Sequence, residues 1–155
     1  MVTFIGEYNC KIDPKGRLML PMAFKKQMQG SNQDRFVIKK DVYVNCLVLY
    51  PYDEWQKQCE KLNSKDEGAD RDMDRFVRLF TRGAAEVMLD ANNRMLVPKR
   101  LLEQIKADKE VVLAGQFGKI EVWSREDYDN QDIDEDEFAR LADKVIKGRT
   151  GETKK

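Results

Sequence analysis

The stretch Ile12–Pro21, IDPKGRLMLP, occurs a second time in altered form at Leu89–Pro98 as LDANNRMLVP. Apolar residues fill the same positions in both copies. Asp, Arg and Pro recur at the same spacing, 77 residues apart, as Asp13, Arg17 and Pro21 in the first copy and Asp90, Arg94 and Pro98 in the second. Such a duplication can represent a doubled active site, a doubled binding loop or a doubled turn.

The duplication extends beyond these two stretches in both directions. Upstream, Gly6–Asp13 aligns with Gly83–Asp90; downstream, each proline begins a short amphipathic segment, and proline is favoured at a first helical position. Two runs rich in β-branched and aromatic residues then predict a hairpin in each half, followed by an acidic helix start. Each half therefore predicts the order β-turn-β-α-β-β-α. The predicted hairpin strands are Phe36–Lys40 with Cys46–Pro51, and Glu110–Gly115 with Lys119–Ser124.

Two further helices are expected outside the repeats. Asp70–Gly83 has one apolar face and ends in glycine, whereas Asp134–Gly148 has acidic residues in its first turn and lysines in its last, which suits the helix macrodipole. The chain is therefore predicted to be a β-rich α+β protein. The expected divisions are a first module over 1–65, a linker helix over 66–80, a second module over 81–128, a C-terminal helix over 129–148 and a disordered tail over 149–155.

The charge of the chain is balanced overall but not along its length. Lys+Arg and Asp+Glu both number 28 among 155 residues, so no net charge attracts nucleic acid. Residues 1–50 carry eight basic and four acidic side chains, whereas residues 81–155 carry 14 basic and 16 acidic ones. An anion-binding face is therefore expected in the first half.

Several classes of function are excluded by residue types that the chain lacks. It has no histidine, and its three cysteines show no Cys-x-x-Cys spacing, so neither a zinc site nor a histidine-activated nucleophile is expected. A dyad of Asp13 and Asp90 would need a hydroxyl residue and glycine after each aspartate, but Pro14 and Ala91 follow. We therefore expect no enzyme activity, metal, cofactor or small-molecule substrate. Without a signal peptide or a run of about 20 apolar residues, a cytoplasmic protein with no membrane partner is expected.

Both copies of the repeated stretch have the composition of a tight turn. In Asp13–Gly16, Asp can accept hydrogen bonds from the backbone ahead, Pro14 presets φ, and Gly16 accepts a left-handed conformation. Asn93 takes the glycine position in the second copy, and Asn is the best non-glycine residue for positive φ. Asp13, Asp90, Asn93 and Arg94 are accordingly predicted to structure the loops.

The arginine after each turn has two interpretations. An ion pair with the aspartate that opens the turn explains Arg17 and Arg94 alike. In the first copy, however, Lys15 lies at the loop tip and Lys11 two residues before Asp13. A projecting two-stranded loop with lysine and arginine can enter a DNA groove, contact phosphates and hydrogen-bond to guanine edges.

The doubled Asp-x-x-x-Arg stretches, together with LVLYPYDEW (Leu47–Trp55) and KIEVWSREDY (Lys119–Tyr128), resemble the MraZ family of bacterial transcriptional regulators. The resemblance covers about residues 1–128. It implies two interlocked AbrB-like swapped-hairpin modules in a barrel-like, pseudo-two-fold core, a ring-shaped homo-oligomer, and binding to short direct repeats upstream of the cell-division and cell-wall gene cluster. It also implies a nucleoid-associated protein. Its motif places the candidate DNA contacts at Lys15, Gly16 and Arg17, with Lys11 beside them.

The second copy departs from the motif of the family. Asn92 and Asn93 stand where a more basic, glycine-containing second loop would match the family better, which favours a structural or subunit-contact role for Arg94.

The alternative to a DNA-binding regulator is a protein-interaction module, antitoxin-like or scaffold, whose acidic C-terminal helix docks a protein partner. That alternative requires the apolar stripe Phe138, Leu141 and Val145 to be uncovered in the isolated chain.

Overall fold

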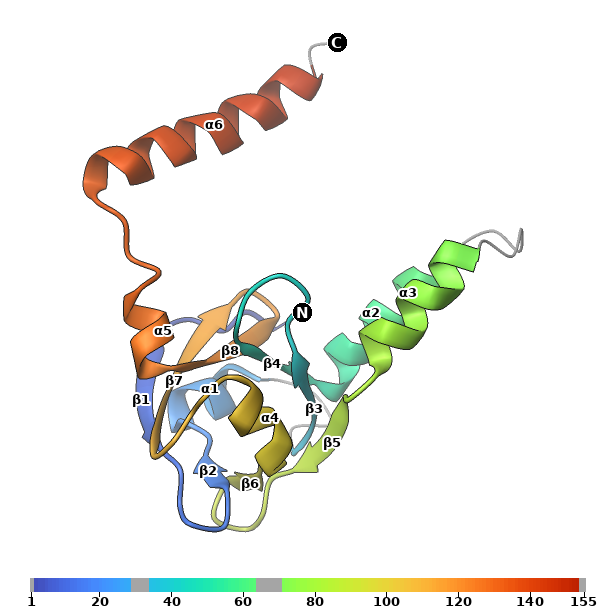
Figure 1. Cartoon of the computed structure of the whole chain (residues 1–155), viewed down its shortest axis with the longest axis vertical. Helices are drawn as coiled ribbons and strands as arrows, with labels where there is room; N and C mark the ends of the chain where they lie inside the picture. The colour runs from blue at the N-terminus through green and yellow to red at the C-terminus, as the bar shows by residue number, and fades with distance from the viewer. Residues whose placement is uncertain (1, 29–33, 64–70, 154–155) are drawn as a thin grey trace.

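The computed structural model of the chain describes residues 2–28, 34–63 and 71–153, and each half has the predicted element order (Figure 1). The first half comprises β1 (Glu7–Lys11), β2 (Arg17–Met19), α1 (Met22–Gln27), β3 (Arg35–Lys40), β4 (Leu47–Pro51) and α2 (Tyr52–Asn63). The second comprises β5 (Ala85–Met88), β6 (Arg94–Leu96), α4 (Lys99–Gln104), β7 (Glu110–Gln116), β8 (Lys119–Ser124) and α5 (Arg125–Asp129). Helices α3 (Arg71–Thr81) and α6 (Glu135–Thr153) lie outside the repeats.

Strand pairing interlocks the two halves. The six-stranded sheet has the order β1-β7-β8-β4-β3-β5, so β1 of the first half pairs with β7 of the second, and β5 of the second pairs with β3 of the first. The central pair β4–β8 and the separate two-stranded ribbon β2–β6 also join the halves. All these pairs are antiparallel. The predicted α+β fold of swapped hairpins is confirmed; within the described residues its strands form this open sheet and the ribbon, not one closed barrel.

The core lies between the six-stranded sheet and the β2–β6 ribbon with its two short helices. On the ribbon, Leu18 pairs with Met95, and both side chains are buried. The apolar positions four apart after each proline are buried as well, with Phe24 and Leu101 each facing the core. The Phe24 ring packs edge-on against the Phe4 and Tyr8 rings at 5.5 and 5.1 Å between centroids. Both halves therefore contribute strands to both layers of the same core.

Helices α2 and α3 form a pair that projects from the β3–β4 side of the body (Figure 1). Their contact is aromatic: the Trp55 and Phe80 rings stack with 5.8 Å between centroids and 4° between planes. The Lys39 Nζ lies 4.3 Å from the centre of the Phe80 ring, and burial lowers the pKa of this lysine. α3 ends at Thr81 and is followed by Gly83 at φ +80°, as its glycine stop predicts. The predicted first residues of this helix, 66–70, lie outside the described residues.

Helix α6 extends away from the rest of the molecule (Figure 1). It continues to Thr153, whereas the sequence predicts its end at Gly148. The described positive-φ residues do not include Gly148, so it makes no left-handed stop and costs the helix only about 1 kcal/mol relative to alanine. The last two residues of the predicted tail, 154–155, are outside the described part of the chain. Among the described residues, no helix combines the length and the apolar character that a membrane crossing requires.

Candidate nucleic-acid interface

The first loop is a tight turn held by the Asp13 carboxylate. The Gly16 amide donates to the Asp13 carbonyl at 2.9 Å, and the Asp13 amide donates to the Arg17 carbonyl at 3.0 Å. The Asp13 Oδ1 accepts from the Lys15 amide at 2.9 Å and from the Arg17 amide at 2.8 Å. Gly16 closes the turn at φ +88°. The Asp13 side chain therefore holds the Lys15 and Arg17 amides, while its main-chain carbonyl holds the Gly16 amide.

The second loop has the same hydrogen bonds with different residues. The Asn93 amide donates to the Asp90 carbonyl at 3.0 Å, and the Asp90 amide donates to the Arg94 carbonyl at 2.8 Å. The Asp90 Oδ1 accepts from the amides of Asn92 and Arg94 at 2.8 and 3.0 Å. Asn93 adopts φ +60°, the left-handed conformation that glycine takes in the first loop. The duplication is therefore, at the level of the backbone, a duplicated turn.

Each arginine makes an ion pair with the aspartate of its own loop. The Arg17 Nε lies 2.6 Å from the Asp13 Oδ2, and the Arg94 Nε lies 3.2 Å from the Asp90 Oδ2. All four side chains are about one-third exposed. The local ion-pair interpretation thus describes both arginines. Each ion pair uses only the Nε–H of the arginine, which is one of the five N–H donors of a guanidinium. The contact with Asp13 therefore fixes the orientation of the Arg17 guanidinium and leaves its other N–H groups available.

Backbone hydrogen bonds tie the two loops to each other across the β2–β6 ribbon. The Val97 amide donates to the Gly16 carbonyl at 3.0 Å, and the Leu20 amide donates to the Asn93 carbonyl at 2.9 Å. These bonds correspond to each other in the two repeats. Gly16 is buried, and a Cβ at this position would lie 3.1 Å from the Val97 carbonyl oxygen. Gly16 therefore allows the close approach of the loop backbone to Val97, and its carbonyl hydrogen-bonds the loop to the second repeat.

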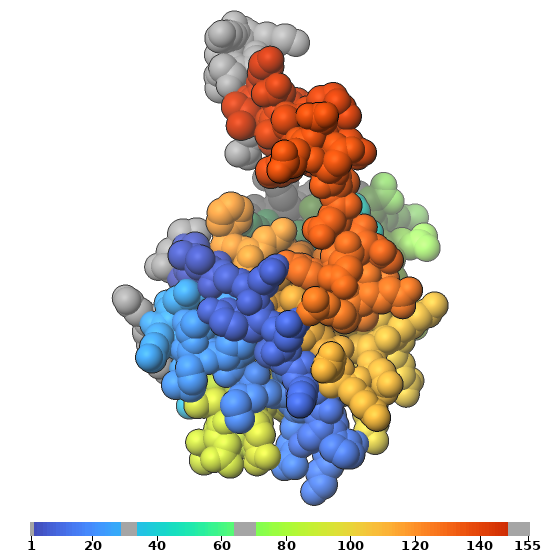
Figure 2. All heavy atoms as spheres, turned by 90° about the vertical axis from the view of Figure 1, so that its left-hand side faces the viewer, coloured from blue at the N-terminus to red at the C-terminus, as the bar shows by residue number. Residues whose placement is uncertain are grey.

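The exposed surface of this region lies at the end of the molecule opposite α6 (Figure 2). Lys11 and Lys15 are both exposed. The outer face of the ribbon also presents Met19 and Leu96, which are 55% and 59% exposed and lie opposite Arg94 and Arg17, respectively, in the strand register. These two apolar residues are not among the site residues predicted from the sequence. The alternation of Leu18-Met19-Leu20 and Met95-Leu96-Val97 could have revealed them, because the middle residue of each run must face outward.

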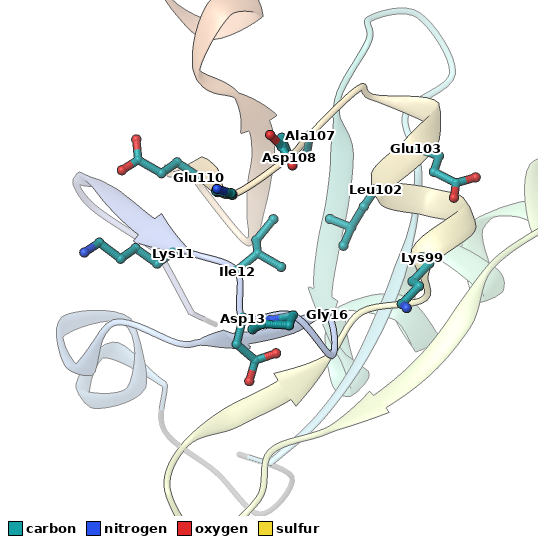
Figure 3. A pocket seen from close by; sticks show the side chains of 12 residues that line it. Lys11, Ile12, Asp13, Gly16, Lys99, Leu102, Glu103, Ala107, Asp108 and Glu110 are labelled. Carbon is teal, nitrogen blue, oxygen red and sulfur yellow. The ribbon is translucent and has the colours of Figure 1, made fainter.

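A cavity of about 660 Å³ lies behind the first loop (Figure 3). Ile12 and Leu102 point toward each other across it, while the Lys11 side chain points outward. Its charged lining residues are three lysines and four acids: Lys11, Lys99, Lys109, Asp13, Glu103, Asp108 and Glu110. This mixture creates no field that selects an anion. The described residues also contain no cluster of metal-ligating side chains.

The hydrogen bonds of the loops predict their response to acid. The Arg17 amide, followed by the Arg17 side chain and the Lys15 amide, lowers the pKa of Asp13; the Arg94 amide likewise lowers the pKa of Asp90. A carboxyl whose pKa is lower in the folded state stabilises that state above its unfolded pKa of about 3.9, and this contribution is lost as the pH falls through the folded value. Both loops should therefore keep their structure from neutral pH to about pH 4 and loosen below it.

This response can be measured by following the backbone amide resonances of Lys15 and Arg17 by NMR from pH 7 to pH 2. We expect a midpoint below about 3.9. In Asp13→Asn the transition should vanish from the first loop and persist at Asn92 and Arg94. A midpoint at or above 3.9 in the wild type would show that the carboxylates do not accept these amide bonds.

Two interlocked hairpin repeats with a pair of polar loops at one end define a swapped-hairpin α+β protein whose candidate site is an exposed loop surface. The model of one protein family, described as "MraZ protein, putative antitoxin-like", matches residues 3–76 and 80–146. The chain belongs to the MraZ family, as the sequence resemblance indicates.

Named relatives support this assignment over nearly the whole chain. The chain is 42% identical to a protein of Christiangramia forsetii, with 94% of each chain covered, and 39% identical to one of Flavobacterium psychrophilum, with 94% of this chain and 93% of the relative covered. It is 38% identical to one of Desulforamulus reducens, with 92% and 97% covered. All three are named "Transcriptional regulator MraZ". The expectation of a transcriptional regulator that is not an enzyme is confirmed.

Proposed function

We propose that this protein is a cytoplasmic, nucleoid-associated transcriptional regulator that binds double-stranded DNA at short direct repeats upstream of the cell-division and cell-wall gene cluster. It binds as a ring-shaped homo-oligomer. The observation that carries this proposal is the first loop, a hydrogen-bonded, exposed turn with Lys15 at its tip, Lys11 at its base and Arg17 on its outer face. The relatives named as transcriptional regulators support the same role.

The loop residues have separate tasks in this proposal. Lys15 and Lys11 contact phosphates, which fixes the position of the loop on the duplex. Arg17, held by Asp13, directs its remaining N–H groups toward a guanine edge in the major groove. Gly16 keeps the backbone in the shape that places its neighbours. The exposed Met19 and Leu96 provide apolar surface beside the arginines for thymine methyl groups.

Self-assembly compensates for the neutral composition of the chain. A single protomer with a few phosphate contacts should bind weakly and with strong dependence on salt. Several loops on one ring, each facing one repeat, raise the effective concentration of the later contacts and strengthen binding by about 10²–10⁴-fold. An isolated protomer is therefore expected to bind its operator too weakly to regulate transcription.

Fluorescence anisotropy of labelled promoter DNA tests this function. The wild-type protein should bind the duplex upstream of its own gene at least about 10³-fold more tightly than a scrambled duplex of the same composition. The logarithm of its binding constant should fall linearly with the logarithm of the salt concentration, by about 0.9 for each phosphate contact. Equal affinity for both duplexes would contradict sequence-specific binding, and tight, salt-resistant binding by a monomeric variant would contradict the role of the ring.

The alternative function, a protein-interaction module that uses α6, is favoured by one specific observation. The stripe Phe138, Leu141 and Val145 is exposed, as this alternative requires. A pull-down with the full chain and with a chain ending at Asn130 would test it. A partner retained only by the full chain, together with no binding to promoter DNA, would support the interaction module over the DNA-binding regulator.

A further inference from the structure

An arginine stripe runs along one face of α3 and continues to Arg82, the residue directly after the helix, whose amide donates to the Arg78 carbonyl at 3.0 Å. Arg71, Arg75, Arg78 and Arg82 follow each other at intervals of four, three and four residues, which places them on one side of a helix, and all are exposed. Arg75, Arg78 and Arg82 line, together with Leu79, a hollow of about 620 Å³. None of these three arginines forms an ion pair with a carboxylate of the described residues. The exposed apolar side chains of Leu79 and Phe76 border the stripe.

Helix α6 has the complementary charge in its first turn, which contains only acidic residues before the apolar stripe. Glu135 and Glu137 flank the beginning of its apolar stripe of Phe138, Leu141 and Val145, whose side chains are 63%, 49% and 52% exposed. From Gln131 to Gly148 every residue except Ala142 is exposed, so the body of its own chain leaves this face uncovered. A helix with an acidic beginning and an exposed apolar stripe thus occurs in the same chain as an exposed arginine stripe on α3, whose other face packs against α2. Neither exposed stripe is covered by other residues that the structure describes.

We propose that α6 of one copy packs on the arginine stripe of α3 in a second copy. The pairing is antiparallel, because that orientation places Glu135 and Glu137 beside Arg82 and Arg78 near the end of α3. It also brings Lys144 of α6 toward Asp74 near the beginning of α3, and it opposes the two helix dipoles. Leu141 and Phe138 then cover Leu79 and Phe76, so charge sets the orientation and register while apolar area provides the affinity.

A second copy fits this surface better than DNA does. The candidate DNA loops lie at the end of the molecule opposite α6, and exposed Leu79 and Phe76 beside the arginines suit a protein surface more than a phosphate backbone. Moreover, α6 and α3 project from different sides of the body (Figure 1). Each copy therefore offers a donor helix and a separate acceptor helix, which makes the contact head-to-tail, and a head-to-tail contact closes into a ring when its rotation allows. The contact rests on the self-assembly proposed above and specifies its interface.

Charge-reversal variants of the full chain, examined by sedimentation velocity and native mass spectrometry over a range of concentrations, test this contact. Arg75→Glu/Arg78→Glu reverses the acceptor helix, and Glu135→Lys/Glu137→Lys reverses the donor helix. Each variant alone should assemble about 100-fold more weakly than the wild type, because like charges then face each other. An equimolar mixture of the two should assemble again, since each acceptor then meets an opposite donor. Glu103→Lys/Asp108→Lys, a reversal of two exposed carboxylates away from both helices, should assemble like the wild type.

The possible results separate this contact from the proposed function. Assembly of both reversed variants at the wild-type concentration would overturn the contact while leaving the ring and its DNA binding in place. A wild type that stays monomeric at all concentrations would overturn the contact and the ring together. Helix α6 would then pack on its own chain or on a different protein. Loss of DNA binding by an Arg75→Glu/Arg78→Glu variant that still assembles would assign the stripe to DNA and overturn the contact. The contact is supported only if each variant by itself loses assembly and the equimolar mixture recovers it.

Discussion

Replacing both cationic side chains of the first loop, in the variant Lys15→Ala/Arg17→Ala, is expected to weaken binding to promoter DNA at least about 100-fold. Loss of a specific arginine contact to guanine costs about 1–3 kcal/mol, and loss of a phosphate contact lowers the salt slope by about 0.9. Because every protomer of a ring carries the change, the losses multiply over the loops that engage the repeats. Anisotropy titrations at several salt concentrations measure both the affinity and the slope.

Two controls separate a lost contact from lost structure. Lys57→Ala/Lys61→Ala removes the same charge from α2, away from the loops, and should bind DNA within a few-fold of the wild type. The loop variant must also keep the circular dichroism spectrum and the oligomeric mass of the wild type, since Arg17 pairs with Asp13. If the folded, assembled loop variant bound as tightly as the wild type, the assignment of the DNA-binding site to this loop would be wrong.

The second loop offers an internal comparison for the same experiment. Arg94 makes the same ion pair as Arg17, but Ala91 and Asn92 replace the proline and lysine at its tip. Arg94→Ala should therefore weaken DNA binding less than Arg17→Ala does. An equal loss would show that both loops contact the duplex and that the second loop is more than a structural counterpart.

Local chemistry allowed the turns and elements to be predicted from the sequence. Asp13 with Gly16, and Asp90 with Asn93, specify the same hydrogen bonds, because these bonds join residues that are at most four positions apart in the chain. The prolines before α1 and α4 and the apolar spacing after them likewise placed those helices within a residue or two. Where a feature depends on residues close together in the chain, composition was sufficient.

Features that depend on distant parts of the chain were harder to predict. The burial of Gly16 follows from its bond with Val97 across the ribbon, and nothing near Gly16 in the sequence indicates that partner. The exchange of β1 and β5 between the halves came from the family resemblance, because strand pairing between repeats cannot be read from apolar periodicity. The arginine stripe of α3 is visible in the sequence as a regular spacing, but the apolar face of the same helix is sufficient to predict the helix, so the spacing alone does not indicate a contact surface.

Separating the two halves is expected to abolish the fold of each. A fragment of residues 1–65 lacks β7, β5, β6 and β8, which are the partners of β1, β3, β2 and β4. Fully buried side chains such as Leu18, Phe36 and Leu49 would then lose their cover from the second half. Each exposed apolar side chain costs about 1.5–3 kcal/mol, so a few such losses exceed the roughly 5–15 kcal/mol that stabilises a domain.

Heteronuclear NMR of the labelled 1–65 fragment measures this effect directly. Alone it should give the narrow amide dispersion of an unfolded chain, and addition of unlabelled 66–155 should restore the spectrum of the intact protein. A chain ending at Asn130, which loses only α6, should stay folded, because that helix packs none of the core. A well-dispersed spectrum from 1–65 as a monomer would show that the first repeat folds independently. A dispersed dimer would mean that the repeats are similar enough for one half to replace the other, and that the interlocked chain contains two copies of what was originally a subunit contact.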